Sequence, residues 1–92
     1  MRKIEEDMCC AVDSRRNWRR SNTRVECEDG WIRVYLFGNL IMEESPNGVR
    51  HYSTAGWDTP TTRSRLRALG CDAWHYRGEL YCDGQLWNGR DW

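Results

Sequence analysis

The sequence predicts an α+β fold, with an antiparallel sheet of about five to six strands that two helices partly cover. Two observations lead to this prediction. Apolar residues recur at spacings of three and four in two segments, which is the period of a helix. Between and after those segments, apolar and polar residues alternate in short runs bounded by turn residues, which is typical of antiparallel strands. The expected order is α-β-β-β-β-α-β-β, in a single domain that spans residues 1–92.

The first helix is predicted over residues 2–17. Apolar residues from Ile4 to Val12 lie three or four positions apart, and no glycine or proline interrupts the segment. Acidic residues open it and Arg15 and Arg16 close it, an order that the helix macrodipole favours. The arginine cluster that these two residues begin therefore starts at the helix end and continues into a loop.

Four strands are expected next, at residues 23–28, 31–37, 40–42 and 49–53. Turns are predicted between them at residues 28–30, 38–39 and 45–48, where glycine, asparagine and proline gather. Because these connections are short, we expect consecutive strands to pair as an antiparallel meander.

The second helix is predicted over residues 60–69. Thr59 suits the N-cap, Pro60 suits the first helical position because that position needs no amide hydrogen, and Gly70 suits a left-handed C-terminal stop. The side chains expected to lie on the sheet are Thr62, Leu66 and Leu69. Two or three short closing strands are predicted after the helix, at residues 73–77, 79–82 and 85–87.

The tryptophans divide into two groups by position. Trp31 and Trp74 stand at strand starts and Trp57 stands next to the helix cap, so we expect these three in the core. Trp18 lies between two arginine pairs, outside any clear apolar periodicity. It fits either a hydrophobic staple or an exposed platform on which a base stacks.

Arginine supplies thirteen of the fourteen basic residues, and five of these arginines fall within residues 15–24. A guanidinium group binds phosphate or carboxylate through two parallel hydrogen bonds and stacks on aromatic and base faces. On the second helix, Arg63 and Arg67 share one flank and Arg65 is expected to turn further away. The residues expected to contact a partner or RNA are Arg15, Arg16, Trp18, Arg19, Arg20, Asn22, Arg24, Arg63, Arg65 and Arg67.

Charge and polar-residue spacing restrict the class of function. Fourteen acidic residues match fourteen basic ones, so no long-range field attracts the whole molecule to nucleic acid. The cysteines are odd in number and include no Cys-x-x-Cys pair, and the carboxylates and histidines form no metal-binding or catalytic spacing. We therefore expect reduced thiols, no metal, no cofactor and no enzymatic activity. No apolar stretch is long enough to span a bilayer, so we expect no membrane association.

Three blocks of the sequence resemble a pattern found in small proteins of tailed bacteriophages. The blocks are SNTRVE at residues 21–26, YLFGNLI at 35–41 and AGWDTPTTRSRLRALG at 55–70, with a late Leu86-Trp87. This likeness implies a phage origin and a shared fold more than an activity. In size and phage character the chain is also similar to the anti-CRISPR proteins, small phage inhibitors of CRISPR surveillance complexes that include inhibitors of type I-F systems. That second likeness involves no shared catalytic motif.

Three classes of function compete on this sequence: an inhibitor that docks on a host ribonucleoprotein, an autonomous binder of single-stranded nucleic acid, and an enzyme. The neutral charge favours the inhibitor, because a free-standing non-specific binder gains its affinity from counterion release and is usually basic. We expect the partner to be a host CRISPR ribonucleoprotein, with its protein subunits and guide RNA both contacted and target DNA hybridisation obstructed. The free protein is expected to be monomeric in the host bacterial cytoplasm.

Overall fold

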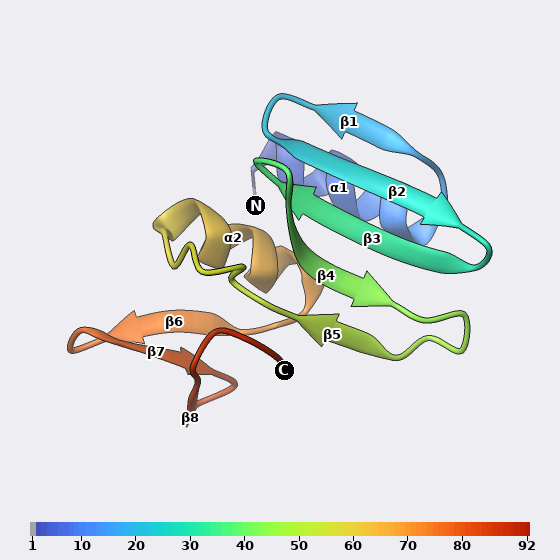
Figure 1. Cartoon of the computed structure of the whole chain (residues 1–92). Coiled ribbons are helices and arrows are strands. Elements are labelled where there is room, and N and C mark those ends of the chain that lie inside the picture. Colours follow the sequence, from blue (N-terminus) through green and yellow to red (C-terminus); the bar gives the residue numbers. More distant parts are fainter. Residues whose placement is uncertain (1) are drawn as a thin grey trace.

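A computed structural model describes residues 2–92, which fold into two helices and two antiparallel sheets (Figure 1). The elements are α1 (Lys3–Asp13), β1 (Trp18–Arg20), β2 (Thr23–Glu28), β3 (Trp31–Leu36), β4 (Asn39–Glu44), β5 (Arg50–Tyr52), α2 (Pro60–Leu69), β6 (Ala73–Tyr76), β7 (Glu79–Cys82) and β8 (Gln85–Leu86). The α+β class and the two expected helices are confirmed. The strands form two sheets where one was expected.

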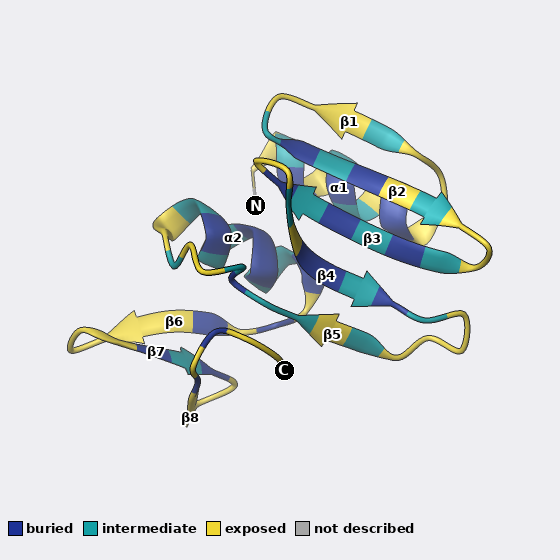
Figure 2. Ribbon diagram, in the orientation of Figure 1, coloured by how far each residue is buried: buried dark blue, intermediate teal, exposed yellow. Residues whose placement is uncertain are grey.

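The larger sheet is a meander in the order β1-β2-β3-β4-β5, with every neighbouring pair antiparallel. Alternate residues of β2 and β3 are buried, as Figure 2 shows, because one face of the sheet packs against the helices. Val25, Ile32, Val34 and Met42 lie on that buried face, each at most 1% exposed. The opposite face carries polar and aromatic side chains to solvent.

The smaller sheet, β6-β7-β8, packs beside α2 and does not extend the larger one. Its inner face carries the buried residues Ala73, Leu80 and Cys82. The edge at β5 is met instead by the C-terminal segment, where the Trp92 amide donates a hydrogen bond of 3.1 Å to the Tyr52 carbonyl. The C-terminal segment therefore occupies part of the β5 edge, and β6 to β8 form a separate sheet.

The N-terminal region differs from its prediction. Helix α1 ends at Asp13 and not near Asn17, and a three-residue strand, β1, occupies part of the segment expected to be a loop. Pairing with β2 creates this strand, and Asn17 secures its start because the Asn17 side-chain oxygen accepts a 2.7 Å hydrogen bond from the Cys27 amide. Three residues give too short a run for alternation to reveal a strand in the sequence.

Helix α2 has the ends that its sequence predicts. Thr59 Oγ1 accepts a 3.1 Å hydrogen bond from the Thr62 amide at the N-cap, and Gly70 ends the helix with a φ of 112°. The predicted sheet-facing side chains of the helix are buried, namely Thr62, Leu66 and Leu69.

The expected core tryptophans are not in the core. Trp57 is 62% exposed, Trp74 is 53% exposed and Trp31 is half-buried. Trp57 lies in the loop before α2, and Trp74 falls on the outward face of β6, so strand alternation directs it to solvent. The large buried aromatic side chain is instead Trp87, which stacks edge-on against Trp92 with ring centroids 6.1 Å apart.

Candidate nucleic-acid interface

Arg19 and Arg24 stand directly opposite each other on β1 and β2, on the face of the large sheet that points away from the helices. The same row continues to Tyr35 on β3. The Arg24 guanidinium lies over the Tyr35 ring, with its carbon 4.3 Å from the ring centroid. Two like charges at directly opposed positions cost stability, so this pair is suited to an anion that neutralises it.

Within the described part of the chain, Arg24 has an acidic neighbour but lacks a hydrogen bond at its Nε. Its Nε lies 3.2 Å from Glu26 Oε1, close enough for an ion pair. The direction of the N–H does not fit a hydrogen bond, and this buried nitrogen has no hydrogen-bond partner among residues 2–92. The side chain is therefore held by stacking on Tyr35 and by the charge of Glu26. No hydrogen bond at Nε to a described residue contributes.

The two arginines border an open hollow of about 540 Å³, here called the arginine hollow. It lies between the β1–β2 turn and the β3–β4 turn, which are joined by a 2.8 Å hydrogen bond from the Phe37 amide to the Asn22 carbonyl. The residues that line it are Arg19, Ser21, Asn22, Thr23, Arg24, Tyr35, Phe37 and Gly38. Polar groups and guanidinium side chains thus surround a space open to solvent.

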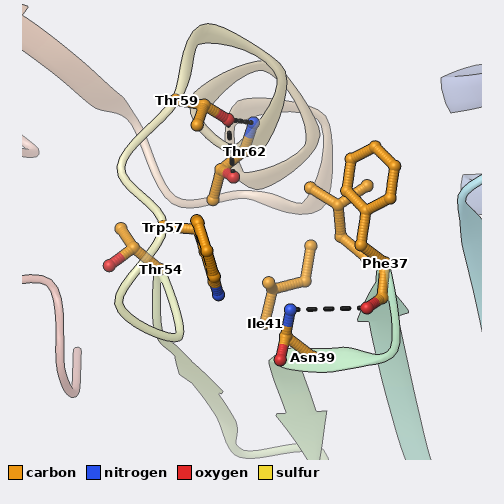
Figure 3. Close-up of a pocket in the computed structure, with 8 residues that line it drawn as sticks. Phe37, Asn39, Ile41, Thr54, Trp57, Thr59 and Thr62 are labelled. Carbon is orange, nitrogen blue, oxygen red and sulfur yellow. Dashed lines mark hydrogen bonds between the residues drawn. The ribbon is translucent and has the colours of Figure 1, made fainter.

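A second pocket of about 360 Å³, here called the aromatic pocket, lies on the other side of Phe37. The Phe37 side chain is 71% exposed, and Figure 3 shows it across the pocket from Trp57, with Ile41 between them. The residues that line the pocket are Leu36, Phe37, Asn39, Ile41, Thr54, Trp57, Thr59 and Thr62. Because Phe37 lines both spaces, a positively charged hollow and an apolar pocket adjoin each other.

A family comparison gives the origin of the chain. The sequence model of the Kyanoviridae Gp96 protein matches residues 1–91. The chain belongs to the Kyanoviridae Gp96 family. This result confirms the expected phage origin, whereas it contains nothing specific to CRISPR inhibition. Comparison with curated proteins gave no match, and neither did comparison with solved structures.

The arginine cluster of this Gp96 family member is divided by the alternation of β1. Arg20 points to the opposite face from Arg19 and forms an ion pair of 3.1 Å with Asp7 of α1. Arg15 lies at the far end of the sheet, where it forms an ion pair of 3.2 Å with Glu44. Arg16, in the loop after α1, is exposed. The five clustered arginines therefore do not share one surface.

Arg65 was expected among the residues that contact a partner or RNA, but the structure buries it between the helices and the sheet. Its guanidinium donates to Glu5 at 2.7 Å, to Thr23 Oγ1 at 3.1 Å and to the Asn22 side-chain oxygen at 3.3 Å. The expectation was wrong because α1 packs against the flank of α2 that carries Arg65 and supplies a buried carboxylate there. Asn22 is accordingly half-buried, and its side chain supports Arg65.

The other arginines of α2 are held by contacts within the chain. Arg63 forms an ion pair of 2.7 Å with Asp58. Arg67 donates to the Ala73 carbonyl at 2.8 Å and stacks on Trp74, with 3.8 Å between the guanidinium carbon and the ring centroid. Both side chains therefore fasten α2 to neighbouring segments, and they lie outside the arginine hollow.

Trp18 falls on the helix-facing side of β1, opposite the buried Val25. It is half-buried and packs against the core, which favours the packing alternative over an exposed platform. The exposed aromatics of this region are instead Phe37, which lines both spaces, and Trp57, which lines the aromatic pocket; neither was expected there from the sequence. Period-two alternation was a signal for Tyr35, because it directs that residue to the face opposite Val34.

Within residues 2–92, no group of three or more histidine, cysteine, aspartate or glutamate side chains could hold a metal ion. Neither helix in this range is long and apolar enough to cross a membrane.

Proposed function

We propose that this Gp96 family member is a non-catalytic binding protein of the phage, which attaches to a host ribonucleoprotein in the bacterial cytoplasm. One observation carries the proposal: Arg19 and Arg24 stand side by side on an open sheet face, next to the aromatic rings of Tyr35 and Phe37. Guanidinium groups bind phosphate, and exposed aromatic rings stack on unpaired bases. The chemistry of this face is that of a single-strand RNA contact.

The charge of the chain favours RNA on a protein scaffold over free RNA. The net charge is zero, and many of the arginines are already paired with acids, as Arg15, Arg20 and Arg63 illustrate. Affinity for a bare strand at physiological salt should therefore not exceed the range of non-specific electrostatic binding, about 10⁻⁴ to 10⁻⁶ M. Tighter attachment requires further contacts with a protein.

The outer face of the small sheet offers such contacts. Trp74, Tyr81 and Leu86 form one row across its three strands, and Tyr76 lies on the same face. Trp74, Tyr76 and Leu86 are exposed. Tryptophan and tyrosine are enriched in the buried centres of protein interfaces, so this face is suited to a protein subunit.

A CRISPR surveillance complex is the ribonucleoprotein that we propose as the partner. Effectors of this type hold guide RNA on protein and read target DNA by base pairing with it. A domain that binds both guide RNA and a protein subunit would obstruct that pairing by its bulk. Such an inhibitor needs no catalytic group.

Affinity capture from host lysate tests this function, with and without ribonuclease. Two variants provide a matched pair: Arg19→Gln and Arg20→Gln remove the same charge from adjacent residues on opposite faces of β1. We expect wild-type protein and Arg20→Gln to capture a complex that contains RNA, and Arg19→Gln to capture much less. Melting temperatures check that both variants are folded.

The other outcomes would contradict the proposal in distinct ways. Capture that is unaffected by both ribonuclease and Arg19→Gln would indicate a partner recognised through protein alone. Nanomolar binding of purified protein to a bare oligonucleotide would indicate an autonomous nucleic-acid binder. Capture of an RNA-containing complex other than a CRISPR complex would contradict the named partner and leave the RNA contact standing.

A further inference from the structure

We propose that the aromatic pocket binds one unpaired base of the RNA strand, while the phosphate that follows or precedes this base lies in the arginine hollow. The inference rests on the proposed RNA contact and adds the pocket that binds the base. It follows from the shape of the pocket, its polar rim and its continuity with the arginines.

The shape of the aromatic pocket suits a flat ring. Phe37 and Trp57 stand on opposite sides, and each exposes most of its side chain. Ile41 and Leu36 provide an apolar floor, and both are buried. The volume of about 360 Å³ is sufficient for a ring to enter between the two aromatic side chains. Exposed aromatics at such a site are costly to leave in water, and stacking a base on them removes that cost.

The rim of the pocket carries groups that match the edge of a base. Asn39 Nδ2 makes a long contact of 3.4 Å with the Phe37 carbonyl, and Asn39 Oδ1 accepts no hydrogen bond from the residues that the structure describes. On the opposite wall, the hydroxyls of Thr59 and Thr62 hydrogen-bond each other at 3.0 Å, and Thr59 Oγ1 also accepts from the Thr62 amide. The Asn39 amide can donate to and accept from the polar edge of a base, whereas an aliphatic ligand would offer its oxygen no hydrogen bond.

Continuity with the arginine hollow selects a nucleotide over an apolar peptide. Phe37 lies in the turn after β3 and lines both spaces, so a ligand that stacks on it reaches Arg19 and Arg24 within the same surface. A base joined to its phosphate has this combination of a flat apolar ring and an adjacent negative charge. A hydrophobic peptide segment offers the ring without the phosphate.

The decisive experiment compares two strands of equal charge. The protein is titrated in parallel into fluorescein-labelled octauridylate and into a labelled abasic ribose-phosphate strand of the same length, and the two affinities are compared. Low ionic strength is used because salt weakens the phosphate contacts. We expect the strand with bases to bind at least about fivefold more tightly, which is the lower end of the effect of stacking one base. Phe37→Ala and Trp57→Ala should remove this difference. Val49→Ala is the control, since Val49 is an exposed apolar residue between β4 and β5 that lines neither the aromatic pocket nor the arginine hollow.

The outcomes separate this inference from the proposed function. If both strands bind equally well to the wild-type protein, the phosphate contact stands and the base pocket is wrong. If neither strand binds at low salt, the RNA contact and the base pocket both fail. If the preference for bases persists in Phe37→Ala and Trp57→Ala, with both variants folded, the base lies elsewhere. Shifts of the Asn39 side-chain amide resonances on binding of octauridylate, absent with the abasic strand, provide an independent check.

Discussion

Glu5 and Arg65 connect the two helices through a buried ion pair, with 2.7 Å between Arg65 Nη1 and Glu5 Oε2. Each side chain is 4% exposed. The Ser64 hydroxyl donates a hydrogen bond of 2.6 Å to the same carboxylate oxygen. Arg65 in turn reaches Thr23 at the start of β2, so the pair ties α1, α2 and the sheet together.

Removing one member of this pair should be strongly destabilising. Arg65→Met keeps an apolar stem and leaves Glu5 buried without its cation, so we expect a loss of about 3–5 kcal/mol in the free energy of unfolding. The double variant Glu5→Leu/Arg65→Met should recover much of that loss, because no charge is then left buried. Arg20→Met is the control: the pair of Arg20 with Asp7 is exposed and should be worth less than about 1 kcal/mol. Denaturant unfolding measures all three, and equal losses at both sites would contradict this view.

The same carboxylate should make stability depend on acid. Burial disfavours the charge of Glu5, but the hydrogen bonds from Ser64 and Arg65 and the charge of Arg65 outweigh it, so the pKa of Glu5 lies below its ordinary value of 4.5. Because the unfolded chain then binds the proton more readily, this contribution is complete above pH 4.5 and is lost as the pH falls through the lower pKa of the folded state. The stability gap between wild type and Glu5→Gln, measured in denaturant, should therefore narrow below pH 4.5. A gap that is constant from pH 7 to pH 3 would show that Glu5 does not titrate in this way.

Gly89 fastens the C-terminal segment to the loop after β5. Its carbonyl accepts hydrogen bonds from the Thr54 amide at 2.8 Å and from Thr54 Oγ1 at 3.0 Å. A Cβ at Gly89 would lie 2.7 Å from Thr54 Oγ1, whereas a Cβ at Gly78 would meet nothing within 4 Å.

The two glycines form a matched pair, because φ is 80° at Gly89 and 81° at Gly78. Gly78→Ala should therefore report the backbone cost alone, roughly 1–2 kcal/mol. Gly89→Ala should lose more, since the clash with Thr54 is added to the same backbone cost. Thermal unfolding of the two variants tests this, and equal losses would mean that the C-terminal segment is not packed against Thr54.

The cysteines should differ sharply in reactivity. Burial raises the pKa of Cys71 and of Cys82, and both side chains are inaccessible, whereas Cys10 is exposed on α1. Because the thiolate is the reactive form, iodoacetamide should label Cys10 first and the two buried thiols last in the native protein. Labelling followed by peptide mass spectrometry, with a phosphine reductant present, measures the order. The reductant is needed because Cys71 Sγ and Cys82 Sγ lie 2.7 Å apart and could be oxidised to a disulfide without it. Rapid native labelling of Cys71 would contradict this packing.

Local signals in the sequence were sufficient for much of the fold. The ends of α2 follow from Thr59, Pro60 and Gly70, because capping and left-handed backbone are properties of single residues and their near neighbours. The meander from β2 to β5 follows from alternation and short turns. Of the candidate interface, Arg19 and Arg24 were recognisable from the sequence by their residue type and clustering.

Tertiary packing decided what local signals could not. Pairing of β1 with β2 places Arg19 on one face and Arg20 on the other, because side chains alternate along a strand. This strand has only three residues, too few for the sequence pattern to reveal it. Docking of α1 on α2 buries Arg65 against a carboxylate sixty residues away in the sequence. Trp57 and Phe37 line one pocket because the loop before α2 lies near the β3–β4 turn. The sequence by itself thus determined which residues carry charge and where the regular elements lie, and the contacts between distant segments determined which of those charges and rings face solvent together.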